Sequence, residues 1–187
     1  MLVGLHNPLF LSALVNKPVS GGGGTCASSP VWTQTGAAPW GLNRSYYFYA
    51  GGQYVGTGET VCKIGFQLSA AGDISARTFN AKIFNCNADS GYNLGSLIAT
   101  SNGITGNNSW SYTDVVFTFA TPVTLTNGFG YAITIDNGVV DESNCVVPYY
   151  SAYGGPMASM QLWDNTGTTS ILWTPPNVFG MSMYLYS

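Results

Sequence analysis

The sequence predicts an all-β protein, an antiparallel, jelly-roll-like β-sandwich with an extended N-terminal arm. Apolar and polar residues alternate along several short runs, and this pattern places every second side chain on one face of a sheet. Glycine, asparagine and proline separate the runs, and no stretch combines helical periodicity with caps. Hydrophobic residues make up 45% of the 187 residues, which is enough for the core of one domain.

The N-terminal segment differs in composition from the rest, so we divide the chain into an arm with a glycine tether (residues 1–24) and a sandwich (residues 25–187). The apolar run around residues 9–15 is limited by Pro8, and no basic residue precedes it, which argues against a secretory signal. The run is also too short to span a membrane. We expect the arm to dock on a partner protein or on a neighbouring copy, the alternative being packing against its own sandwich. The residues predicted to make this contact are Leu2, Val3, Leu5, Leu9, Phe10, Leu11, Leu14 and Val15.

Alternation is clearest in five segments of the sandwich, and each predicts a strand with one buried face. In the first of them, residues 60–68, Cys62 is predicted to share the buried face with Ile64 and the apolar residues that follow. The other four are residues 79–83, 115–119, 131–135 and 179–185. Shorter strands are expected at residues 46–50, 97–101, 145–149 and 160–163, and long polar loops at residues 87–95 and 103–109.

Charge and cysteine content exclude several classes of protein. Charged residues are only 7%, with five Lys and Arg against eight Asp and Glu, so the net charge is -3. We therefore expect no nucleic-acid partner and no anionic membrane surface as partner. The cysteines form no C-x-x-C motif and are expected to be mostly buried free thiols, with a disulfide between strands as the alternative. They are Cys26, Cys62, Cys86 and Cys145.

The order of the strand segments resembles that of "choice-of-anchor" β-sandwich domains of bacterial surface proteins and of tailed-phage structural proteins. The resemblance covers residues 46–187 and is carried by residues 60–68, a Gly-Asp turn, and residues 79–84, 95–101, 115–119, 128–135 and 180–186. It implies display of the sandwich on a surface. The arm on its glycine tether is similar to those of phage capsid-decoration, head-fibre and tail proteins.

This resemblance implies a non-enzymatic virion structural protein, most simply a bacteriophage capsid-surface decoration protein. Its partners would be other virion proteins, bound through the arm, and copies are expected to form a homo-oligomer, with a trimer preferred. Its location would be the virion, assembled in a host cytoplasm. No cofactor is expected.

Catalysis finds little support in the residues themselves. The sole histidine, His6, lies in the arm, so a Ser-His-Asp or Cys-His arrangement would have to recruit it from a flexible segment. The acidic residues mostly lie in or beside turns, where aspartate bonds the local backbone. We therefore expect no enzymatic activity, and a hydrolase is only the third hypothesis.

A carbohydrate-binding adhesin is the alternative function, because sugar sites combine aromatic rings with hydrogen-bonding groups. The candidate residues for a host surface glycan are Trp163, Asp164, Asn165 and Trp110. The competing interpretation is that these rings cap the sandwich or fill subunit interfaces.

One loop is a candidate calcium site, because it gathers the carboxylates of Asp136, Asp141 and Glu142 after a predicted strand. Calcium prefers such oxygen ligands, although the spacing is not that of an EF-hand. The alternative is a solvated, turn-forming loop.

Overall fold

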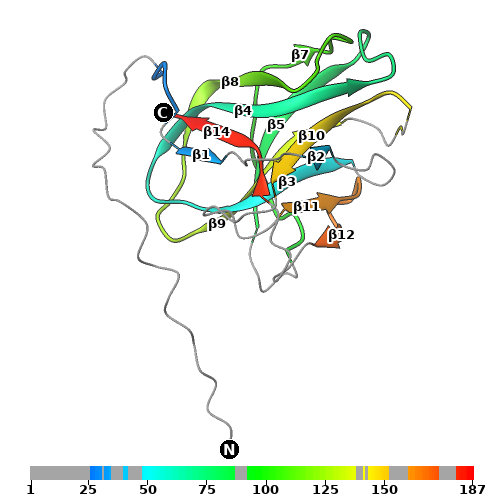
Figure 1. The fold of residues 1–187 in the computed structure, drawn as a ribbon. Coiled ribbons are helices and arrows are strands. Elements are labelled where there is room, and N and C mark those ends of the chain that lie inside the picture. Colours follow the sequence, from blue (N-terminus) through cyan, green and yellow to red (C-terminus); the bar gives the residue numbers. More distant parts are fainter. Residues whose placement is uncertain are drawn as a thin grey trace, which may run out of the picture.

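Two antiparallel β-sheets packed face to face make up the protein (Figure 1), which confirms the predicted antiparallel β-sandwich. The computed structural model describes residues 26–30, 32–34, 40–41, 48–86, 92–137, 141, 143–151, 160–172 and 180–187. Within these residues each sheet has seven strands. The predicted arm, including His6, lies outside the described residues.

The first sheet is organised around the long strand β4 and is called the β4 sheet below. Along one edge β4 pairs with β8, and along the other it pairs with β14 at residues 63–66 and with β10 at residues 68–71. Short strands complete this sheet, β1 beside β14 and β2 and β13 beside β10. Its strands are β1 (Trp32–Gln34), β2 (Trp40–Gly41), β4 (Thr60–Ala71), β8 (Thr113–Thr124), β10 (Cys145–Ser151), β13 (Gly180–Met181) and β14 (Met183–Tyr186).

The second sheet, called the β9 sheet, has the order β12-β11-β3-β9-β5-β6, with β7 also paired to β5. The chain crosses between the sheets repeatedly, because β3, β5, β9 and β11 lie in this sheet while β4, β8 and β10 lie in the other. Its strands are β3 (Tyr49–Val55), β5 (Thr78–Asn85), β6 (Leu97–Thr100), β7 (Ile104–Thr105), β9 (Gly130–Asp136), β11 (Met160–Trp163) and β12 (Thr169–Leu172).

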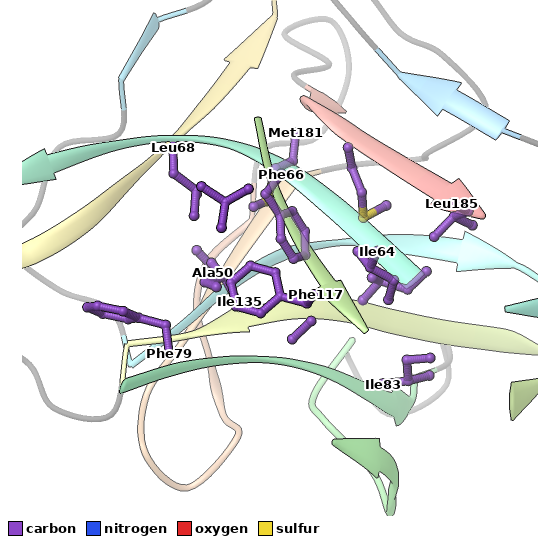
Figure 2. Packing of buried hydrophobic residues seen from close by; sticks show 14 of the residues in the cluster. Ala50, Ile64, Phe66, Leu68, Phe79, Ile83, Phe117, Ile135, Met181 and Leu185 are labelled. Carbon is purple, nitrogen blue, oxygen red and sulfur yellow. The ribbon is translucent and has the colours of Figure 1, made fainter. Parts of the chain in front are cut away.

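The main core fills the space between the two sheets (Figure 2). Phe66 of β4 packs edge-to-face on Phe117 of β8, with ring centroids 5.9 Å apart. Phe79 and Ile83 of β5 are fully buried in the same cluster. The inward faces predicted for residues 79–83 and 115–119 are therefore confirmed.

A second, smaller core lies on the other side of the β9 sheet. It contains Phe84, Cys86, Ala132 and Trp163, with three partly buried residues packed against it. Ala132 neighbours Ile133 of the main core, so the two point to opposite faces of β9. Strand β9 is consequently buried on both faces, whereas simple alternation predicted one solvated face for residues 131–135.

Strand β3 is longer than predicted and lies mostly beyond the expected residues 46–50. Its two glycines weaken the strand signal, because glycine has low β-propensity. At Gly51, however, an added Cβ would lie 2.1 Å from the carbonyl oxygen of Ile133. Glycine is required there by the close approach of β3 and β9.

A bulge in the pairing of β4 with β8 changes the predicted role of Cys62. The β4–β8 register shifts between Val61 and Lys63, and Val61 takes the place in the main core that alternation assigned to Cys62. Cys62 instead forms a disulfide with Cys26, with the two Cα atoms 5.9 Å apart. The expectation of free thiols is therefore wrong for this pair, while Cys86 and Cys145 are buried thiols as expected.

The disulfide should make the stability of the protein sensitive to reductant. It closes a loop of 36 residues, so Cys26→Ser should lower the free energy of unfolding by up to about 3–4 kcal/mol. Chemical denaturation with and without reductant measures this effect. Reductant should lower the midpoint of the wild type and leave that of Cys26→Ser unchanged. An unchanged wild-type midpoint would contradict the assignment.

Candidate functional site

Two sheet edges run along the same side of the sandwich. Among the described strands, β8 pairs only with β4, and β6 pairs only with β5. The amide of Asn102, just after β6, donates to the carbonyl of Thr118 in β8 at 2.8 Å, which joins the two edges. Edge strands expose backbone groups that can pair with another chain.

A groove of about 460 Å³ lies between these edges. Ile98 is 40% exposed at its rim, and the neighbouring Leu97 is 52% exposed. The lining contains no charged side chain and consists of Ile98, Ala99, Thr100, Phe119, Ala120, Thr121, Pro122, Val123 and Thr124. We call this feature the edge groove.

A bulge of β8 opposite Cys62 shapes the edge groove. Val61 pairs with Val123 and Lys63 pairs with Thr118, so residues 119–122 of β8 lie opposite the single residue Cys62. Pro122 has no amide to donate to a ladder, which suits an edge position. The disulfide holds Cys26, the first described residue, beside Cys62, which lies opposite residues 119–122 of β8.

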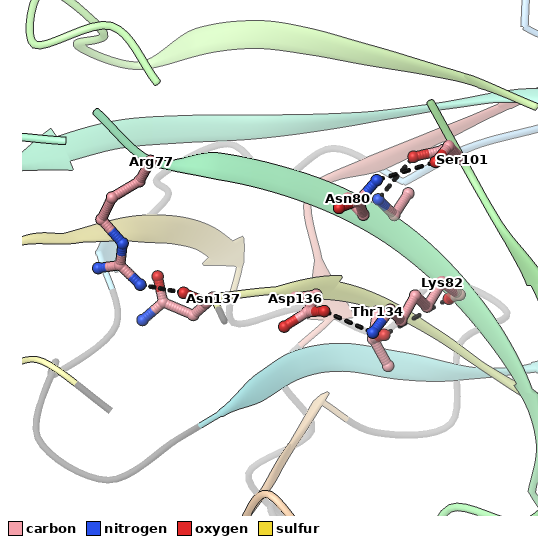
Figure 3. A network of polar contacts seen from close by, with 8 residues as sticks. Arg77, Asn80, Lys82, Ser101, Thr134, Asp136 and Asn137 are labelled. Atoms are coloured by element: carbon pink, nitrogen blue, oxygen red, sulfur yellow. Dashed lines mark hydrogen bonds and ion pairs between the residues drawn. The ribbon is translucent and has the colours of Figure 1, made fainter. Parts of the chain in front are cut away.

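Arg77, which precedes β5, and Lys82 of β5 use their charges within the fold (Figure 3). Lys82 Nζ lies 2.5 Å from Asp136 Oδ2, and the Arg77 guanidinium donates to the carbonyls of Asn137 and Asn144. Burial alone would lower the pKa of Lys82, but the hydrogen bond and charge of Asp136 raise it above its usual value. These contacts connect β5 to β9 and to the chain before β10.

The buried carboxylate of Glu59 supports a turn. Its Oε2 atom accepts hydrogen bonds from the amide and the hydroxyl of Thr57, at 2.7 and 2.5 Å. Burial, followed by the hydrogen bond and charge of Glu59, raises the pKa of Tyr54 well above its usual value. The Glu59 carboxylate therefore stabilises the connection between β3 and β4.

The residues predicted to bind a glycan do not form one open site. Trp163 is fully buried in the second core, and its indole Nε1 donates to the carbonyl of Tyr92 at 2.9 Å. Trp110 is half-buried against the main core, with its ring centroid 6.3 Å from that of Phe79. The prediction that Trp163 presents a stacking surface is therefore wrong, because no face of its ring reaches solvent.

The two polar residues beside Trp163 belong to the turn between β11 and β12. Asp164 Oδ1 accepts hydrogen bonds from the amides of Thr166 and Thr168, at 2.8 and 3.0 Å, and from the Thr166 hydroxyl at 2.6 Å. The hydrogen bond from the Thr166 side chain is the largest cause that lowers the pKa of Asp164. Asn165 is exposed in the same turn.

The predicted calcium ligands have separate partners. Asp136 forms the ion pair with Lys82, whereas Asp141 accepts the amides of Ser143 and Asn144 at 2.9 and 3.1 Å. Glu142 lies outside the described residues. Across the described part of the chain, no three His, Cys, Asp or Glu side chains gather in a group that could hold a metal ion. The geometry of Asp141 is that of the turn-forming alternative.

Comparison with known proteins adds no family. No protein-family model matches the chain, and no curated protein matches it. Among the described residues, no helix is long and apolar enough to cross a membrane. The resemblance to choice-of-anchor domains thus remains a prediction, while the all-β sandwich is what the structure establishes.

Sequence reasoning missed the edge groove, although part of its signal is visible in the sequence. Pro122 follows the alternating run of β8, and proline in a strand indicates an edge. The approach of the β6 edge to the β8 edge has no local signal, because it brings together residues far apart in the chain.

Because Trp163 is buried, we expect its removal to lower the stability of the fold rather than to act on ligand binding. Trp163→Ala should lower the free energy of unfolding by about 3–5 kcal/mol, because it leaves a cavity and removes the donor to Tyr92. Phe129→Ala is a control, since this ring is 61% exposed, and it should change stability by less than about 0.5 kcal/mol. Denaturant unfolding of both variants measures the difference. A Trp163→Ala protein as stable as the wild type would contradict this placement.

Proposed function

We propose that this protein is a non-enzymatic virion structural protein, a capsid-surface accessory protein of a bacteriophage, whose copies are joined by their N-terminal arms. The observation that supports this mode of association is the uncharged edge groove between two sheet edges that no further described strand pairs with. The assignment to a virion rests on the resemblance in strand order and on the arm with its glycine tether.

The arm has the chemistry that the edge groove requires. Residues 1–16 contain no Asp, Glu, Lys or Arg and are rich in leucine and valine. The lining of the groove is likewise uncharged. Association of these two surfaces leaves no ion unpaired, so the desolvation cost of buried charge is avoided. An extended segment that adds to a sheet edge also satisfies the backbone groups of that edge.

The anchoring point of the arm allows it to reach a second molecule. The disulfide fixes Cys26 to β4, and ten residues separate Val15 from Cys26. Ten extended residues span up to about 35 Å, which is comparable to the dimension of a small domain. We assign the groove to the arm of a neighbouring copy. Such head-to-tail contacts form a ring when their rotation closes, and a trimer is the smallest ring beyond the dimer.

Removal of the arm tests this function. A chain that begins at Thr25 keeps the disulfide and should still fold cooperatively, but it should sediment as a monomer while the full chain sediments as an oligomer. It should also fail to incorporate into particles assembled with the other virion proteins. Equal sedimentation of both chains, or full incorporation of the shortened one, would contradict the proposal.

A pair of matched substitutions tests the groove as the site of this contact. Thr121→Asp places a charge in the edge groove, whereas Thr126→Asp places the same charge at an exposed site outside it. The first should weaken self-association of the full chain at least about tenfold, or about 1.4 kcal/mol, and the second should not. Equal effects of the two substitutions would exclude the groove as the binding site.

A further inference from the structure

The outer face of the β4 sheet carries a group of tyrosines. Ile64, Phe66 and Leu68 of β4 point into the main core, so the residues between them point outward. On that outward side the register places Tyr184 and Val116 on either side of Gly65, and Asp114 beside Gln67. We call this surface the tyrosine face, and its residues are Tyr112, Tyr149, Tyr184, Tyr186, Lys63, Gly65, Gln67, Ser69, Asp114 and Val116.

Tyr184 lies across the middle of the tyrosine face. A Cβ added to Gly65 would lie only 3.0 Å from Tyr184 Cδ2, so the tyrosine ring packs directly on the glycine backbone. The Tyr184 hydroxyl donates to Asp114 Oδ1 at 3.1 Å. Since Tyr184 belongs to β14 and Asp114 to β8, on opposite edges of β4, the side chain crosses β4 and lies along the sheet surface.

Two interactions fix the orientation of this ring. The glycine beneath it allows the close contact, and the carboxylate of Asp114 holds its hydroxyl. Burial and then the charge of Asp114 raise the pKa of Tyr184 to about 12, so the hydroxyl remains protonated and continues to donate at neutral pH. The ring is half-buried, which leaves part of it exposed to solvent.

Tyr112 and Tyr149 form a second aromatic pair on the same surface. Their ring centroids are 4.7 Å apart at an interplanar angle of 77°. Ser69 connects them, because its Oγ accepts the Tyr112 amide at 2.8 Å and donates to the Tyr149 hydroxyl at 2.9 Å. The aromatic rings are therefore interleaved with fixed polar groups.

The backbone of Tyr112 is held in a costly conformation. Its φ is +57°, in the left-handed region that side chains other than glycine and asparagine rarely adopt. Tyr112 is nevertheless 43% exposed, so burial in a core does not account for a large aromatic side chain at this position. Strain of this kind at an exposed residue is typical of functional sites.

We propose that the tyrosine face binds a neutral polysaccharide whose sugar rings present flat C–H surfaces, such as a β-linked hexopyranose chain. Exposed aromatic rings stack on such surfaces, while the Asp114 carboxylate, the Gln67 amide and the tyrosine hydroxyls bind sugar hydroxyls. The face carries one carboxylate, Asp114, and one ammonium group, that of Lys63 beside Tyr186, so it offers no excess positive charge to an acidic polymer. An open sheet surface can contact several units of an extended sugar chain, whereas it cannot enclose a single sugar. This site is separate from the edge groove and does not depend on the proposed assembly.

Calorimetric titration of the full chain with cellohexaose and chitohexaose tests this proposal. At least one of them should bind with a dissociation constant below about 1 mM, and α-linked maltohexaose, whose chain is curved, should bind at least about tenfold more weakly. Tyr184→Ala should reduce the affinity at least about tenfold. Phe129→Ala removes an exposed ring outside the tyrosine face and should leave binding unchanged.

Tyr112→Asn distinguishes binding from folding. Asparagine tolerates a positive φ, so this variant should have an unfolding midpoint equal to or above that of the wild type, together with reduced affinity. This result would stand even if Tyr184→Ala did not fold. Failure of both β-linked oligosaccharides to bind, or unchanged affinity in Tyr112→Asn, would overturn the proposal. So would dissociation of the oligomer by Tyr184→Ala without sugar binding, which would make the face a protein interface.

Discussion

Pairing of β4 along both of its edges is the constraint on which the rest of the structure depends. One edge holds β8, and the other is shared by β14 and β10. The inward side chains of β4 form much of the main core, and its outward residues, including Gly65 and Ser69, support the tyrosine face. At Cys62, which forms the disulfide, the β4–β8 register shifts and places residues 119–122 of β8 along the edge groove.

The sandwich and most of its core could be predicted from the sequence, because alternation reports directly which side chains face inward. Phe79 and Phe117 are buried as that pattern requires. Prediction was wrong where another contact overrides the pattern. At Cys62 a bulge shifts the β4–β8 register by three positions, and at Ala132 a second core covers the face that alternation left to solvent.

The two surfaces to which we assign functions were harder to predict from the sequence, because each brings together residues that are far apart in the chain. Trp163 suggested a sugar platform because tryptophan and a neighbouring carboxylate are common in such sites, but this carboxylate serves its own turn and the ring fills a core. The tyrosine face joins β4, β8, β10 and β14, which are far apart in the chain. Only the strand register brings Tyr184 and Asp114 together. The low charge of the chain suits the edge groove, because no ion has to be neutralised when its uncharged lining is covered.

The central claim is that the arm of one copy completes the sheet edges of the next. Hydrogen exchange of the backbone amides of β6 and of residues 119–124 measures this contact most directly, in the full chain and in the chain that begins at Thr25. We expect slower exchange at these edges in the full chain only, because the hydrogen bonds of an added strand protect the edge amides. Equal exchange at both edges in the two chains would contradict it.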